Sequence, residues 1–229
     1  MKTIGLIGGI TPESTILYYQ VLNDLAATHF GESHSCKVII NSVDFAEISK
    51  HQKDGNWSAL DQIMANAGKS LENAGASSIL ICANTMHLCI DAVRKAVSIP
   101  VLHIAEATAI QILSKNLKKV ALLGTKYTME KAFYKDVLSS FGIEAIIPST
   151  EDRTMVHNII YDELSKGILS KKAKNDYIKI IHKLEESGAE GVILGCTEIP
   201  LLIKQEDVTI PVFDTTTIHA TAAFKMAIQ

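Results

Sequence analysis

The chain has 229 residues, of which 47% are apolar and 21% charged, with a net charge of −3. This composition is typical of a globular protein and excludes disorder, and no basic run with interleaved aromatics favours nucleic-acid binding. No apolar stretch reaches the roughly 18 residues that span a bilayer, and the N-terminus enters a predicted strand without a signal peptide. Four cysteines without close pairing predict a soluble, cytoplasmic protein with reduced thiols, without a metal site or membrane partner.

Strand-like and helical patterns alternate along the whole chain. Strands are expected at 3–7, 37–42, 78–81, 101–104, 119–123, 144–147, 191–194 and 212–213, with helices between them such as 12–28, 61–74, 130–141 and 174–187. The strands are continuous runs of Val, Ile and Leu, which is typical of parallel strands buried on both faces. Their alternation with helices predicts an α/β fold with right-handed crossovers.

The order of landmarks recurs in the second half. The segment "AGASSILICANT" matches "SGAEGVILGCTE", and Gly188 lies 113 residues after Gly75. The same offset places Ala83 opposite Cys196 and Cys82 opposite Gly195. We therefore expect two pseudo-symmetric parallel-sheet α/β domains, one formed by 1–97 plus 214–229 and the other by 98–213, with a cleft between them.

Small polar residues follow several of the predicted strands. They are Thr11, Asn84, Thr85, Thr125, Thr128, Cys196, Thr197 and Glu198. Ligands of open α/β sheets bind outside the carboxyl ends of the strands, and N–H groups near helix starts suit anions. These residues therefore predict a site for a small carboxylate, although Thr11, Asn84 and Thr85 could simply cap the helices that follow.

The glycines after the first strand suggest an alternative, a dinucleotide site. Such a site needs GxGxxG and an acidic residue about 20 positions later. The chain has Gly5, Gly8 and Gly9 followed by Thr11 and Pro12, so the spacing fails. Nucleotide binding is not expected.

Several motifs together resemble the aspartate/glutamate racemase superfamily over nearly the full length. They are "GLIGGITPEST", "NSVDFAEI", "CANTMH", "LLGTKYTM", "GCTEIPLL" and "IPVFDTTTIHA". The resemblance implies a PLP-independent amino-acid racemase that uses no cofactor, is usually a homodimer and binds its substrate between the two halves. In this family two thiols act on opposite faces of the substrate Cα, one removing a proton as thiolate and the other returning one.

The first of these two thiols is displaced in this chain. The family pattern Cys-Asn-Thr is here Ala83-Asn84-Thr85, whereas the second pattern, Gly-Cys-Thr-Glu, is intact at Cys196. Cys82 lies one residue too early, and alternation along a strand would direct its sulfur to the opposite face unless the backbone curls. We expect Cys196 to be the thiol base and acid, with a pKa lowered by nearby N–H donors. Cys36 and Cys89 are expected to be packing residues.

The resemblance also suggests residues that bind the substrate. Gln52, after "NSVDFAEI", and Lys166, in "YDELSKG", are candidates for the side-chain carboxylate. Glu198 either orients a helix start or accepts the substrate ammonium group. His87 is either a structural histidine or a group that tunes the site.

Ala83 leaves three mechanistic hypotheses open. Cys196 acts alone while water or a hydroxyl serves the other face, or the substrate has a larger or neutral side chain, or the reaction is a single-thiol one. The family includes such a case in arylmalonate decarboxylase, whose one cysteine protonates an enediolate. A non-catalytic dicarboxylate binder is the alternative from another functional class.

Overall fold

The structure is a computed structural model that describes all residues from 1 to 229, and the chain divides into two compact units. The first unit contains Met1–Ile104 and Thr216–Gln229, and the second contains Ala105–Thr215. These divisions fall a few residues after the boundaries expected at 97 and 213. The first division moves because Val101 pairs with Ile79 of the first sheet, which keeps the intervening segment in the first unit.

The first unit is built on three parallel strands, β1 (Ile4–Gly8), β2 (Val38–Ser42) and β3 (Ser78–Ile81), in the order β2-β1-β3. The expectation of a strand at 101–104 is wrong. Only Val101 forms a bridge, because the chain enters helix α5 (Ile104–Leu113) three residues later.

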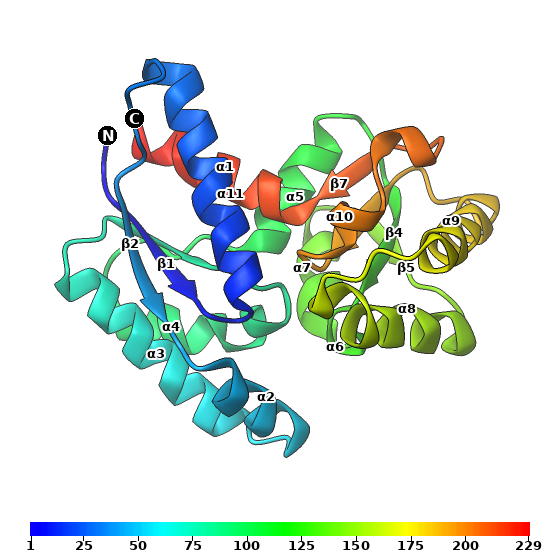
Figure 1. Ribbon diagram of the computed structural model, residues 1–229, viewed down its shortest axis with the longest axis horizontal. Helices are drawn as coiled ribbons and strands as arrows, with labels where there is room; N and C mark the ends of the chain where they lie inside the picture. Colours follow the sequence, from blue (N-terminus) through cyan, green and yellow to red (C-terminus); the bar gives the residue numbers. More distant parts are fainter. The chain divides into compact units, whose positions relative to one another are not determined.

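Helices cover both faces of this sheet. They are α1 (Pro12–Phe30), α2 (Phe45–Lys53), α3 (Trp57–Asn73), the short η1 (Thr85–Cys89), α4 (Ile90–Ala96) and α11 (Thr215–Ala227). On one face, Leu6 and Leu80 pack with residues of α1 and α11, including Leu22 and Phe224. On the other face, the neighbouring strand residues pack with α2, α3 and α4. Figure 1 labels α1, α2, α3, α4 and α11 together with β1 and β2.

The second unit contains β4 (Lys119–Gly124), β5 (Glu144–Ile146), β6 (Val192–Gly195) and β7 (Val212–Asp214), all parallel in the order β5-β4-β6-β7. Its helices are α5, α6 (Lys126–Glu130), α7 (Ala132–Ser140), α8 (Thr150–Asp162), α9 (Lys171–Glu186) and α10 (Ile199–Leu202), with the short η2 (Leu164–Lys166) and η3 (Gln205–Asp207). The single helix expected at 130–141 is two helices, because Lys131 adopts an extended backbone between α6 and α7.

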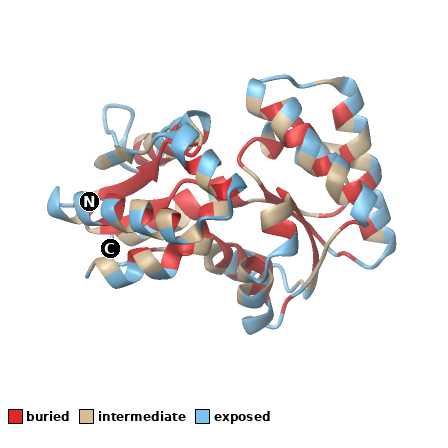
Figure 2. Cartoon of the chain, turned by 90° about the horizontal axis from the view of Figure 1, so that it is seen from below, coloured by how far each residue is buried: buried red, intermediate tan, exposed pale blue.

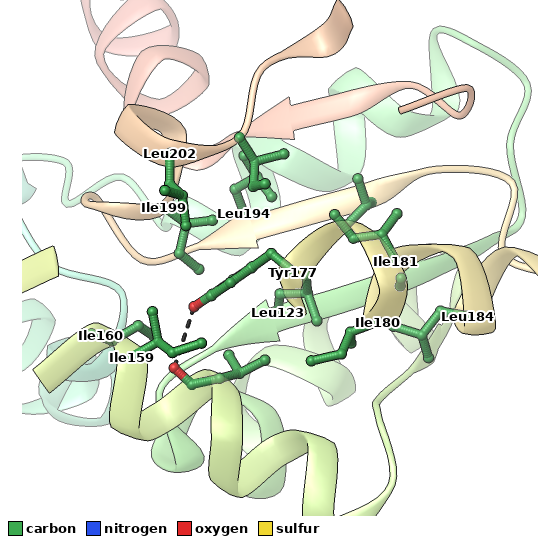
Figure 3. Close-up of a cluster of buried hydrophobic side chains, with 14 of the residues drawn as sticks. Leu123, Ile159, Ile160, Tyr177, Ile180, Ile181, Leu184, Leu194, Ile199 and Leu202 are labelled. Carbon is green, nitrogen blue, oxygen red and sulfur yellow. Dashed lines mark hydrogen bonds between the residues drawn. The ribbon is translucent and has the colours of Figure 1, made fainter. Parts of the chain in front are cut away.

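The core of the second unit lies between its sheet and helices α8, α9 and α10. Leu123 and Leu194 from the strands meet Ile160 and Tyr177 from the helices, as Figure 3 shows. The Tyr177 hydroxyl donates a hydrogen bond of 3.3 Å to the backbone oxygen of Val156, so this large side chain is buried with its polar atom satisfied.

The two units repeat one strand arrangement. In the first, β1 lies between β2 and β3, and in the second, β4 lies between β5 and β6. Ile81 pairs with Ile7 in the first unit, and Leu194, its partner in the sequence repeat, pairs with Leu123 in the second. Figure 2 shows that buried residues concentrate on the strands and on the sides of the helices facing them. The expected fold class, two related parallel α/β sheets, is confirmed.

None of the helices combines the length and the apolar character needed to cross a bilayer.

Candidate active site

Two glycines bring the ends of β4 and β6 close together. A Cβ atom on Gly124 would lie 2.8 Å from the backbone oxygen of Gly195, and one on Gly195 would lie 2.8 Å from that of Leu123. Both distances are shorter than a carbon can tolerate, so only glycine fits at these positions. The close strand ends place Cys196 directly at the carboxyl edge of the sheet.

Cys196 is partly buried, whereas the other three cysteines, all free, are buried. Its neighbours Thr197 and Glu198 are both buried. The Cys196 thiol lies 2.8 Å from Oε2 of Glu198, and the Thr197 hydroxyl donates to the same oxygen at 2.8 Å. One carboxylate oxygen therefore receives two donors, which requires that the thiol carry its proton.

The pKa of the Cys196 thiol is raised well above its ordinary value. Burial of the sulfur is the largest cause, followed by the negative charge and the hydrogen bond of Glu198. The expected N–H donors are present, since the backbone N–H groups of Thr197 and Glu198 act to lower the pKa, but they are outweighed. The expectation of a lowered pKa is therefore wrong. The resting side chain is a thiol with an adjacent proton acceptor.

Glu198 does not act as a helix cap. It occupies the N-cap position of α10, yet its side chain makes no capping hydrogen bond, and its carboxylate instead binds Cys196 and Thr197. The interpretation that it orients the helix start is therefore not supported.

Thr125 and Thr128 are buried at the end of β4. The Thr125 hydroxyl accepts the backbone N–H of Thr128 at 3.3 Å and lies 3.3 Å from the Thr128 hydroxyl. Thr125 thereby caps the short helix α6, and both hydroxyl groups lie at the edge of the sheet from which Cys196 also emerges.

A pocket of about 240 Å³ adjoins this threonine turn. Its lining residues are Lys126, Tyr127, Glu130, Lys131 and His157. Glu130 is bound to Arg153 at 3.0 Å, whereas neither lysine ammonium forms an ion pair. The pocket therefore carries unneutralised positive charge.

Two tyrosines near Cys196 were missed by the sequence analysis. The pKa of Tyr161 is raised to about 12, first by burial and then by electrostatic interaction with Cys196, Tyr127 and Glu198. Tyr177 is fully buried, and Cys196 and Glu198 also raise its pKa. Tyr177 follows the apolar stripe of an amphipathic helix, a pattern that indicates core packing, so no local signal identified either residue.

Cys82, in the first unit, is fully buried. Its side chain packs with Leu6, Leu80 and Tyr18, and burial raises the pKa of its thiol. Ala83 packs on the opposite side of the sheet, in the cluster beneath α3. The alternation expected along the strand therefore holds, and the backbone does not turn the Cys82 sulfur to the side of Ala83.

Three other candidates in the first unit have local contacts. Asn84 is buried at the N-cap of η1 but makes no capping bond through its side chain, so the capping interpretation is wrong for this residue. The Thr11 hydroxyl accepts the backbone N–H of Ser14 at 3.4 Å, so Thr11 does cap α1. Nε2 of Gln52 lies 3.2 Å from the sulfur of Met86.

Four further residues were singled out in the sequence. Thr85, the first residue of η1, is partly buried, and Lys166 is exposed on η2. Cys36 and Cys89 are both buried within apolar clusters, as expected for packing residues.

The parallel sheets of the two units and the threonine, cysteine and glutamate residues at their edges define an α/β protein of the two-domain racemase class. The chain matches the Asp/Glu/Hydantoin racemase family over residues 7–223 and belongs to that family. Racemases are isomerases.

Relatives of known name or structure resemble the chain over most of its length. It is 22% identical over 226 residues to the broad-specificity amino-acid racemase of Bacillus subtilis, covering 92% of each chain. The crystal structure of a candidate Asp/Glu racemase from Yersinia pestis is similar over the whole of both chains, with 48% identity and a TM-score of 0.95. An aspartate racemase homologue from Pyrococcus horikoshii is 42% identical over the whole of both chains, with a TM-score of 0.89.

Proposed function

We propose that this protein is a PLP-independent racemase or epimerase of aspartate, glutamate or a related amino acid, with Cys196 as its acid and base. The observation that carries the proposal is the contact of 2.8 Å between the Cys196 thiol and the Glu198 carboxylate at the end of β6. A thiol beside a proton acceptor can pass through both protonation states during one turnover.

The raised pKa determines the order of the proton transfers. In one direction Glu198 takes the thiol proton, and the resulting thiolate removes the proton from the substrate Cα, leaving an enolate-like carboxylate. In the other direction the neutral thiol gives its proton to the carbanion and recovers one from Glu198. Hydrogen-bond donors such as the hydroxyl of Thr125 are proposed to stabilise the carboxylate charge that grows in the transition state.

The opposite face of Cα is proposed to be served by a water or hydroxyl group. Ala83 corresponds to Cys196 through the sequence repeat and carries only a methyl group. Two facts support this correspondence. Ala83 and Cys196 each pack against the cluster on the matching side of their own sheet, and Ile81 and Leu194 hold matching places in the pairing registers.

The unpaired lysines near the threonine turn support an acidic substrate. Lys126 and Lys131 line a pocket beside Tyr127, and Glu130 of the same pocket is paired with Arg153. A negatively charged amino acid would be attracted to such a region over a neutral one. Gln52, Lys166, Asn84, Thr85 and Thr128 remain candidate substrate contacts.

The protein is further proposed to act in the cytoplasm as a homodimer. Its four cysteines are free, and α1 exposes Ile16 and Tyr19 with 63% and 48% of their surface accessible. Apolar side chains on neighbouring turns of one helix are typical of a protein–protein interface. Light scattering on the purified protein measures the mass directly, and a monomer of 24.9 kDa at micromolar concentration would contradict this part.

The test of the catalytic proposal is proton exchange at Cα. L- and D-aspartate and glutamate are incubated in D₂O with the protein, and loss of the Cα–H signal is followed by NMR while chiral chromatography follows the enantiomers. We expect exchange with at least one of the four, and no exchange above background with Cys196→Ala. A folded protein that catalyses Cα proton exchange in none of these four amino acids would refute the proposal.

Cys196 is the single cysteine that is only partly buried, and this favours a second candidate, a decarboxylase-like reaction. A protonated Cys196 is suited to deliver a proton to the enediolate left when a malonate-type substrate loses carbon dioxide. The measurement is carbon dioxide release from an α-substituted malonate, together with the enantiomeric excess of the product acid. Release without Cα exchange of amino acids would favour this reaction over racemisation.

A further inference from the structure

Three buried histidines cluster in the first unit, outside the residues assigned to the site. They are His87 on η1, His103 just before α5, and His219 on α11. The ring centroid of His87 lies 4.9 Å from that of His103 and 5.5 Å from that of His219. Segments far apart in sequence therefore meet at His87.

Hydrogen bonds determine which ring nitrogen of His87 carries the proton. The backbone N–H of Ile104 donates to Nε2 of His87 at 3.2 Å, so Nε2 is unprotonated. Nδ1 therefore carries the hydrogen and donates it to the backbone oxygen of Ala83 at 2.9 Å. Burial, followed by His103, lowers the pKa of His87 well below its ordinary value, which keeps the ring neutral.

His219 completes the arrangement. Its Nε2 donates to the backbone oxygen of Leu102 at 3.1 Å, which leaves Nδ1 to accept the Tyr18 hydroxyl at 2.8 Å. The backbone on both sides of His103 is therefore held by a neutral histidine, with Leu102 bound to His219 and Ile104 bound to His87.

The peptide groups around position 83 are held from two directions. The Ser14 hydroxyl donates to the backbone oxygen of Cys82 at 2.5 Å, and His87 donates to that of Ala83. With both carbonyl groups held, the direction of the Cα–Cβ bond of residue 83 has little freedom. Because that bond decides where a side chain at position 83 points, His87 controls it through hydrogen bonding.

We propose that His87 is a positioning residue that sets the orientation of position 83 by linking the Ala83 carbonyl to the backbone of Ile104. This inference rests on the proposed function only where it concerns catalysis. The geometric part concerns the first unit alone and can be tested without any activity.

The geometric test uses a thiol introduced as a reporter. In the double variant Ala83→Cys, Cys196→Ser, peptide mass spectrometry separates iodoacetamide alkylation at position 83 from that of Cys36, Cys82 and Cys89, so the rate at position 83 can be followed as a function of pH. His87→Asn keeps an N–H donor near the place of Nδ1, whereas His87→Gln keeps a polar atom near the place of Nε2. His182→Asn is the control, because His182 is an exposed histidine on α9.

We expect His87→Asn and His182→Asn to leave the alkylation rate within about twofold, and His87→Gln to change it by about fivefold or more. A purely structural role would make Asn and Gln act alike, by lowering the melting temperature equally. Equal effects of the two variants, no effect of either, or a larger effect of Asn would each overturn the inference.

The catalytic test is a double-mutant comparison. Ala83→Cys is expected to increase Cα exchange about tenfold, and His87→Gln is expected to remove most of that gain while His87→Asn preserves it. A gain that survives His87→Gln unchanged would overturn the inference. If no variant catalyses exchange, the proposed function fails, and the alkylation result still decides the role of His87.

Discussion

The ends of β3 and β6 are two versions of one structure with different chemical content. After β3 the chain runs Cys82, Ala83, and after β6 it runs Gly195, Cys196. The Cys82 sulfur points into the apolar layer under α1 and α11. Cys196 lies on the other side of its own sheet, beside α8 and α9, and this side corresponds to the side of the first sheet on which Ala83 lies. A shift of one residue along a strand therefore separates a packing cysteine from a candidate catalytic one.

The surroundings of the two strand ends differ as much as the cysteines do. Glu198 and Thr197 place polar groups beside the Cys196 thiol, whereas the Ala83 side chain lies in an apolar cluster and its carbonyl accepts a hydrogen bond from the neutral His87. The comparison teaches that two strand ends with matching places in their sheets can differ in charge. The end of β6 carries a proton acceptor, the Glu198 carboxylate. The end of β3 carries the neutral His87, which is hydrogen-bonded to the backbone.

The strongest test of this comparison is to replace Cys196 and Cys82 separately. Cys196→Ala is expected to reduce Cα exchange by about 10²–10⁴-fold, because an acid–base group is lost. Cys82→Ala is expected to leave exchange within about threefold while lowering stability by roughly 1 kcal/mol, because a buried packing atom is lost. Both are measured by NMR exchange and thermal unfolding. Loss of exchange in Cys82→Ala at full stability would reverse the assignment.

The histidine cluster makes the first unit sensitive to acid. Burial lowers the pKa of His87, of His103 to about 3 and of His219, with Arg94 also lowering that of His103. A histidine kept neutral in the folded state stabilises it above the unfolded pKa near 6.5, and this contribution is lost as pH falls below that value. The stability of the first unit is therefore expected to fall as the pH falls below about 6.5.

Hydrogen exchange of backbone amides at pH 5 to 8, read by mass spectrometry, measures this effect in each unit. Protection of α11 and η1 is expected to fall steeply below pH 6, while α9, in the second unit, changes less. Exposed His182 provides the control through His182→Asn, which should leave the pH dependence unaltered. An equal response of α9 and α11 would contradict the assignment to the cluster.

The substitution Glu198→Gln tests the surroundings of Cys196 at the end of β6. Removing the carboxylate charge takes away a cause of the raised Cys196 pKa, so the midpoint of alkylation against pH should move to lower pH. Exchange should fall by roughly tenfold, because the amide cannot accept the thiol proton. The same substitution at the exposed Glu186 is the matched control. A midpoint that stays in place would mean that Glu198 does not act on the thiol.

The smallest expected difference lies between the two threonine caps. Thr125→Val removes the cap of α6, and Thr11→Val removes that of α1. Each loss is expected to cost about 1 kcal/mol, or about 2–4 °C in melting temperature. Calorimetry checks the stability, and the exchange assay is expected to show a further loss of activity for Thr125→Val, whose hydroxyl is proposed to contact the substrate. Equal activity of Thr125→Val and the parent would remove Thr125 from the site.

Much of the fold was predictable because it follows from local patterns. Continuous apolar runs placed seven of the eight expected strands, since strands buried on both faces leave no alternation to misread. The segment at 101–104 failed because Ile104 begins a helix whose first N–H group bonds to His87. The helix at 130–141 failed because its helical pattern does not reveal the extended backbone of Lys131.

The sequence predicted which side of the sheet the candidate residues face better than it predicted their chemistry. The repeat and the alternation of side chains were sufficient to separate Cys82 from Ala83 by face. The capping role of Asn84 was wrong because that residue already has helical backbone angles. The contacts of Tyr161 and Tyr177 with the thiol region could not be read from sequence, because both residues lie on helices distant from Cys196 along the chain.

The sequence by itself determined the order of elements, the duplication and the residue that stands at each strand end, because periodicity and spacing act over a few residues. Only the tertiary structure decided the protonation of Cys196 and the tautomers of His87 and His219. Those depend on burial and on partners such as Glu198 and Ile104, which become effective only when the folded chain excludes water and holds them at hydrogen-bond distance.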